Sequence, residues 1–82
     1  MPRIGEADGL AIYMHFNDHL PPHCHARTGG GEREGRVAVD PIRMLPDSTL
    51  NAREERAATG WVAANLERFH AAWAAISQGG QP

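Results

Sequence analysis

Four of the chain's five histidines lie within the eleven residues from His15 to His25. Imidazole titrates near neutral pH and is the commonest side-chain metal ligand, so this stretch is where the sequence places its chemistry. Three of these residues, His19, His23 and His25, follow the spacing His-x3-His-x-His, and a Pro-Pro pair stands inside it. No other segment of the sequence carries a comparable signal for a reactive site.

The first hypothesis is a metal site. His23 and His25 fall two residues apart in an expected strand over 23–27, so their side chains point the same way. His19 precedes them in a loop that two prolines stiffen. Three imidazoles can bind a divalent metal such as zinc and leave a position open for water. Asp18 can add a fourth ligand, or accept a hydrogen bond that fixes an imidazole tautomer. The predicted ligands are His19, His23, His25 and Asp18.

The second hypothesis is metal-free acid–base chemistry. Arg27 shares the strand face of His23 and His25, so a guanidinium would stand beside two imidazoles. One imidazole as base, another as acid and a cation on the phosphate are sufficient to cleave RNA. This predicts a toxin-like ribonuclease with the catalytic residues His19, His23, His25 and Arg27. The third hypothesis is structural: the histidines stand on a solvated face, stiffen a loop, and the chain is an interaction protein without a chemical site.

The elements that must position these residues are short strands followed by helices. Strands are expected at 3–6, 10–16, 23–27, 36–40 and 42–45, with a tight turn at Asp8-Gly9. Cys24 and Ala26 alternate away from the histidines and should face the core. Asn51 and Glu54 have the spacing of a capping box, which predicts a helix start.

The helical part is expected to break near Asn65. One helix over 52–77 would be about 39 Å long, whereas a compact chain of this size has a radius of gyration of about 12 Å. Strands followed by helices predict an α+β fold: a small antiparallel sheet of three to five strands and two C-terminal helices packed on one face. Residues 1–78 should form a single domain and residues 79–82 a flexible tail. The predicted core contains Ile12, Met14, Phe16, Val37, Val39, Leu66, Phe69 and Trp73.

Composition limits the partners. The chain has 82 residues and a net charge of −2, which argues against non-specific binding of duplex DNA. One cysteine suggests a reducing compartment, and no apolar run approaches the ~18 residues of a membrane span, so a cytoplasmic protein without a membrane partner is expected. So small a core predicts a homodimer or a small protein partner.

The segment Asn17-Asp-His-Leu-Pro-Pro-His-Cys-His25 resembles the central motif of a bacterial family known as domain of unknown function 4160. Its members open with Met-Pro, here Met1-Pro2, and close with a helical segment ending near a tryptophan, here residues 65–73. The resemblance implies an association with toxin–antitoxin-like gene pairs and assigns no activity. Taken with the histidines, it favours a metal- or small-ligand-binding module that acts with a protein partner.

Overall fold

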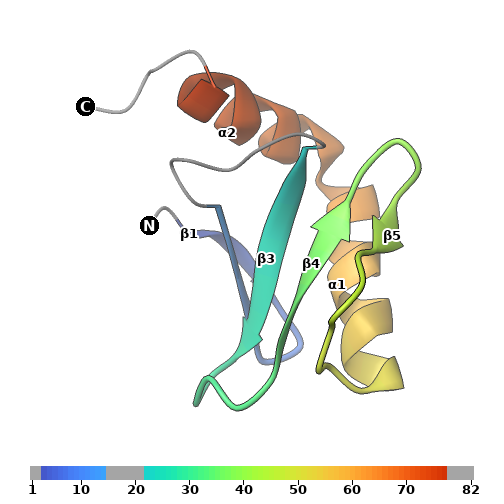
Figure 1. Cartoon of the computed structure of the whole chain (residues 1–82). Helices are drawn as coiled ribbons and strands as arrows, with labels where there is room; N and C mark the ends of the chain where they lie inside the picture. Colours follow the sequence, from blue (N-terminus) through green and yellow to red (C-terminus); the bar gives the residue numbers. More distant parts are fainter. Residues whose placement is uncertain (1–2, 15–21, 78–82) are drawn as a thin grey trace.

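The computed structural model describes residues 3–14 and 22–77. Its strands form one antiparallel sheet in chain order, and its helices follow (Figure 1). The elements are β1 (Arg3–Ala7), β2 (Leu10–Tyr13), β3 (His23–Thr28), β4 (Glu34–Ala38), β5 (Arg43–Met44), α1 (Ala52–Ala64) and α2 (Leu66–Ser77). The predicted α+β fold is confirmed. No helix of the described residues is long and apolar enough to cross a bilayer.

The core lies between one face of the sheet and the helices. α1 contacts strands on both sides of β3, so it crosses the sheet, and α2 contacts α1 and β1. Figure 1 shows α1 behind β4 and β5, with α2 across the upper end of the sheet. The side chains that meet there are nearly all apolar and fully buried. They include Leu10, Ile12, Met14, Cys24, Ala26, Val37, Ala58, Val62 and Phe69.

Two predicted strands differ from the observed ones by two residues or more at an end, and the other three by one residue. The strand expected over 10–16 is seen as Leu10–Tyr13, and Phe16 lies outside the described residues. The strand expected over 36–40 runs from Glu34 to Ala38. It stops before Asp40, whose φ of 65° is incompatible with an extended ladder. The predicted tail, residues 79–82, lies outside the described residues.

The predicted break at Asn65 is confirmed. Asn65 ends α1 with φ −130° and ψ 36°, and its side-chain nitrogen donates to the carbonyl oxygen of Trp61 at 2.8 Å. Leu66, Phe69 and Trp73 follow one another at spacings of three and four residues, which predicts one buried face on a continuous helix. Because the helix breaks, Leu66 is 38% exposed, and its assignment to the core is wrong. Phe69 is fully buried, whereas Trp73 packs against the core only partly buried.

α1 begins at the predicted capping box. Asn51 Oδ1 accepts from the Glu54 backbone N–H at 2.8 Å, and Glu54 Oε1 accepts from the Asn51 N–H at 3.0 Å. Arg33, in the β3–β4 turn, donates to both Glu54 oxygens, from Nε at 2.9 Å and from Nη2 at 2.6 Å. These hydrogen bonds, with the Arg33 bonds the larger cause, lower the pKa of Glu54 to about 2. The carboxylate therefore ties the turn to the helix.

This carboxylate should make the fold acid-sensitive. The pKa of Glu54 lies below its ordinary 4.5, so its stabilisation is complete above pH 4.5 and is lost as pH falls towards 2. Thermal unfolding followed by circular dichroism should show a smaller loss of melting temperature over this window in Glu54→Gln than in the wild type. Glu67→Gln, an exposed carboxylate in the first turn of α2, is the control and should keep the wild-type slope. Equal slopes in Glu54→Gln and the wild type would contradict the assignment.

Candidate functional site

The site lies on the face of the sheet opposite α1. We call it the open sheet face because α1 covers the other side, although Tyr13 and His23 are buried on it. β3 brings its histidines between two neighbours: His25 pairs with Tyr13 of β2 and with Arg36 of β4. Directly paired residues of antiparallel strands point to the same face. The open sheet face therefore carries Tyr13, His23, His25, Arg27 and Arg36. In Figure 1 this face of β3 and β4 lies in front of α1.

His23 and His25 lie side by side on this face. Their ring centroids are 5.3 Å apart and the rings are tilted by 60°. Cys24, between them in sequence, points into the core, where it is a fully buried free thiol. Its predicted position away from the histidines is thus observed.

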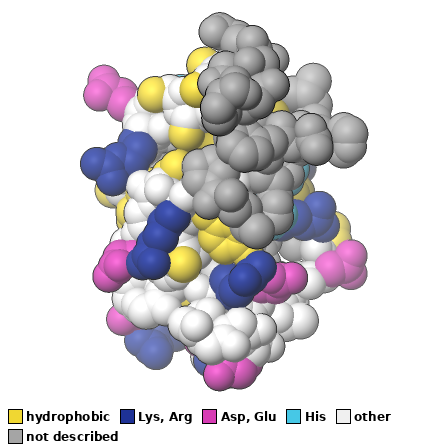
Figure 2. Space-filling model, turned by 90° about the vertical axis from the view of Figure 1, so that its left-hand side faces the viewer, with side chains coloured by type: hydrophobic (Ala, Val, Ile, Leu, Met, Phe, Trp, Pro, Cys, Tyr) yellow, Lys and Arg dark blue, Asp and Glu magenta, His cyan; other side chains and the backbone are white. Residues whose placement is uncertain are grey.

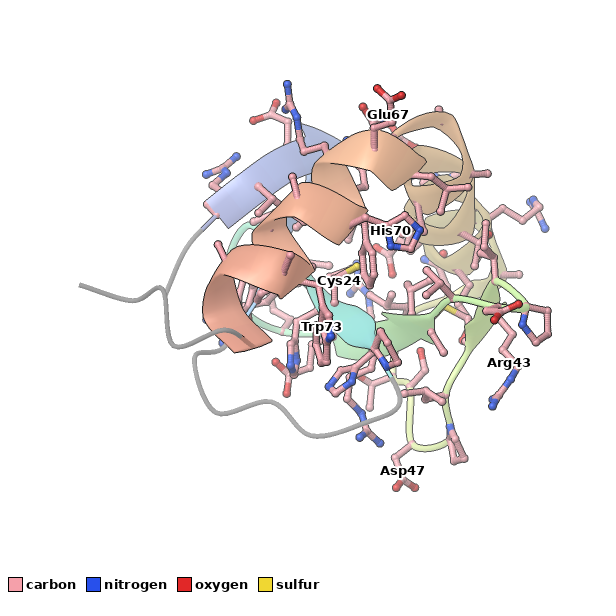
Figure 3. The ribbon with its side chains drawn as sticks, turned by 90° about the horizontal axis from the view of Figure 1, so that it is seen from above. Cys24, Arg43, Asp47, Glu67, His70 and Trp73 are labelled. Carbon is pink, nitrogen blue, oxygen red and sulfur yellow. The ribbon has the colours of Figure 1, made fainter. Side chains whose placement is uncertain are left out.

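The two histidines differ in their surroundings. His23 is only 7% exposed, and its ring centroid lies 6.0 Å from that of Trp73 on α2. Trp73 projects from α2 (Figure 3) and stacks on Phe69 at a centroid distance of 6.4 Å, so His23 is held by the packing of the helix. His25 is half-buried. The Nε2 atom of His25 is nevertheless buried, as is the hydroxyl oxygen of Tyr13.

Tyr13 completes a column of side chains. Its ring stacks with His25 at a centroid distance of 5.6 Å and an interplanar angle of 14°. The guanidinium carbon of Arg27 lies 5.1 Å from the centre of the same ring. Burial raises the pKa of the Tyr13 hydroxyl, and the charge of Arg27 acts in the opposite direction. Alternation along β2 places Tyr13 away from the core, but its pairing with His25 requires the strand register.

A small hollow adjoins His25 on the β4 side. It has a volume of about 110 Å³ and is lined by His25, Glu34, Gly35, Arg36 and Asp47. Both acidic and basic groups surround it, and Arg36 also donates to the carbonyl oxygen of Pro46 at 3.3 Å. A hollow of this size and polarity holds water or a small solute beside an imidazole.

Two of the four predicted metal ligands, His23 and His25, lie among the described residues. Two imidazoles that bind one ion at about 2.0–2.1 Å in tetrahedral geometry have ring centres roughly 5 Å apart, which matches the spacing of His23 and His25. The other predicted ligands, His19 and Asp18, lie outside the described residues, as does His15. Within residues 3–14 and 22–77, no group of three or more histidine, cysteine, aspartate or glutamate side chains is arranged to hold a metal ion.

The same face also brings a cation close to the imidazoles, as the second hypothesis requires. The Arg27 side chain is 42% exposed and forms an ion pair with Glu34, Nε to Oε1, at 3.4 Å. Because this pair is open to solvent, it is worth little and leaves the guanidinium able to bind an anion. His70, the fifth histidine, is exposed on α2, where its ring lies 5.6 Å from that of Phe69.

The fold and this face define the class: a small α+β protein with a five-stranded antiparallel sheet, two C-terminal helices and a histidine-bearing open sheet face. The family described as Domain of unknown function (DUF4160) matches residues 9–74, so the chain belongs to that family. The match runs from the start of the second strand through Trp73 of α2. No curated protein and no solved structure matches the chain.

Proposed function

We propose that the chain is a metal-binding module in which His23 and His25 ligate a divalent ion such as zinc. The observation that carries this proposal is the spacing of 5.3 Å between two imidazoles on one face of β3. The neighbouring loop contributes the remaining ligands in this proposal, His19 and Asp18. Tyr13, stacked on His25, restricts the orientation of that ring and so prepares it for binding.

Metal content tests this proposal directly. Protein purified without a histidine tag should contain zinc, or take up one equivalent in a calorimetric titration. Affinity should fall as pH drops through about 6.5, because protonated imidazole cannot ligate. A chain that neither retains zinc nor binds it saturably would contradict the proposal.

A ribonuclease is the second candidate, and the position of Arg27 favours it. In this mechanism one imidazole takes the proton of a 2′-hydroxyl, whose oxygen attacks the adjacent phosphorus. A second imidazole protonates the departing 5′-oxygen, while Arg27 stabilises the charge on the phosphoryl oxygens. His23 and His25, with His19 from the loop, are the acid and base candidates. Cleavage of RNA in a chelator, with a bell-shaped pH profile, would favour this candidate over the metal site.

We also propose that the module works with a protein partner, either a second copy or another small protein of a toxin–antitoxin-like pair. Leu66 is an exposed large apolar side chain at the start of α2, and the following helix is rich in alanine. Burial of this surface would enlarge the core of a small protein.

Sedimentation should show a dimer at high concentration, and Leu66→Arg should shift it to monomer. The control is Arg56→Ala, an exposed change on α1, which should leave the equilibrium unaltered. A monomer at all concentrations would remove the homodimer and leave only a different partner.

A further inference from the structure

A second, larger hollow lies beside the β1–β2 hairpin, away from His23. We call it the hairpin pocket. Its volume is about 360 Å³, within the size range of small-molecule sites. Its lining includes Arg3 and Glu6 of β1, Ala11 and Tyr13 of β2, and Arg27 and Gly29. Figure 2 shows the side of the molecule that β1 borders, where arginine side chains lie around hydrophobic atoms.

Arg27 forms one wall of this pocket. Its guanidinium carbon lies 5.1 Å from the centre of the Tyr13 ring, and Glu34 contacts its Nε at 3.4 Å. A guanidinium has further N–H donors in the same plane, arranged to bind two oxygens of a phosphate at once. Its flat face also stacks on aromatic rings. Arg27 therefore offers both a phosphate contact and a stacking surface.

Arg3 supplies a second cation at the rim. Its Nη2 forms an ion pair with Glu6 at 2.6 Å, and the two side chains are 58% and 71% exposed. An exposed pair of this kind contributes little to stability, so a dianionic ligand can replace Glu6 as the partner of Arg3. Ala11, which pairs with Arg27 across β2 and β3, adds an apolar side chain to the lining and serves as its apolar floor.

We propose that the hairpin pocket binds a nucleoside monophosphate unit, with its phosphate on Arg27 and Arg3 and its base over the apolar floor. The pocket is large enough for a ring as well as a phosphate, so its volume favours a nucleotide over a simple anion. All eight basic residues of the chain are arginine, the side chain best suited to combine phosphate binding with stacking. The proposal extends the ribonuclease candidate but does not depend on it or on a metal.

The test is titration of the full chain in the presence of a chelator, followed by amide chemical shifts. Adenosine monophosphate is expected to bind with a dissociation constant of about 1 mM or tighter, and to bind more weakly as salt rises. Adenosine and inorganic phosphate should each bind more weakly than the nucleotide. A single-stranded hexanucleotide shows whether the natural ligand is a free nucleotide or part of a nucleic acid chain. Tighter binding than the mononucleotide identifies a nucleic acid chain, and equal or weaker binding identifies a free nucleotide.

Two variants locate the site. Arg27→Gln should weaken binding of adenosine monophosphate by about 10-fold or more, as loss of a charge-assisted contact does. Ala11→Phe keeps every charge but fills the pocket, and it should also abolish binding. Arg43→Gln, an exposed change on β5, is the matched control and should bind as the wild type does. Absence of saturable binding up to about 10 mM, or equal weakening in Arg43→Gln and Arg27→Gln, would overturn the proposal.

Discussion

Replacement of Phe69 by alanine is expected to reduce the free energy of unfolding by about 3–5 kcal/mol, the range for large-to-small changes in cores. Phe69 heads the fully buried side chains by volume and stacks on Trp73 with an interplanar angle of 3°. Its removal would leave a cavity where α2 meets the core. Since native proteins have about 5–15 kcal/mol of total stability, Phe69→Ala should lose a large fraction of it.

Urea denaturation of Phe69→Ala and Leu66→Ala provides the measurement and its control. Leu66 lies three residues earlier on the same helix and is 38% exposed, so at concentrations where the chain is monomeric its truncation should change stability by no more than about 0.5 kcal/mol. If both variants lose the same stability, then Leu66 belongs to the core and the helix face described above is incorrect.

Local signals predicted the fold because they have local causes. The Asp8-Gly9 turn takes the positive φ angles of 50° and 86° that its sequence predicts, and Asn51 with Glu54 forms its capping box within one helical turn. The face of Leu66 could not be predicted in the same way. It depends on how α2 is rotated after the break at Asn65, and this rotation is set by packing on the sheet.

In the candidate site, too, some positions follow from local spacing in the sequence and others depend on how distant segments pack. Alternation along β3 placed His23, His25 and Arg27 on one face because neighbouring positions of a strand point to opposite sides. The positions of Tyr13, Glu34 and Arg36 beside the histidines depend on the register of three strands, which no spacing in the sequence specifies. The Arg33–Glu54 pair likewise joins residues far apart in the chain.

The histidines themselves give the last prediction. His25→Ala is expected to weaken zinc binding by about 100-fold or more, since loss even of an outer-shell partner costs roughly 10–100-fold. His23→Ala should have a similar effect on affinity. It should also lower the melting temperature more than His25→Ala, because His23 is buried beside Trp73. Isothermal titration with zinc, together with a thermal melt of each variant, measures both effects.

His70→Ala is the matched control, because it removes an imidazole that is exposed on α2. It should bind zinc as tightly as the wild type. The ribonuclease candidate makes a different prediction. His23→Ala and His25→Ala should lose RNA cleavage in a chelator, His70→Ala should retain it, and none of the three should bind zinc. If His25→Ala binds zinc as tightly as His70→Ala and neither variant alters RNA cleavage, both chemical proposals fail. The histidines of β3 would then serve only to pack α2 against the end of the sheet, and the fall in melting temperature of His23→Ala would be the sole effect that remains.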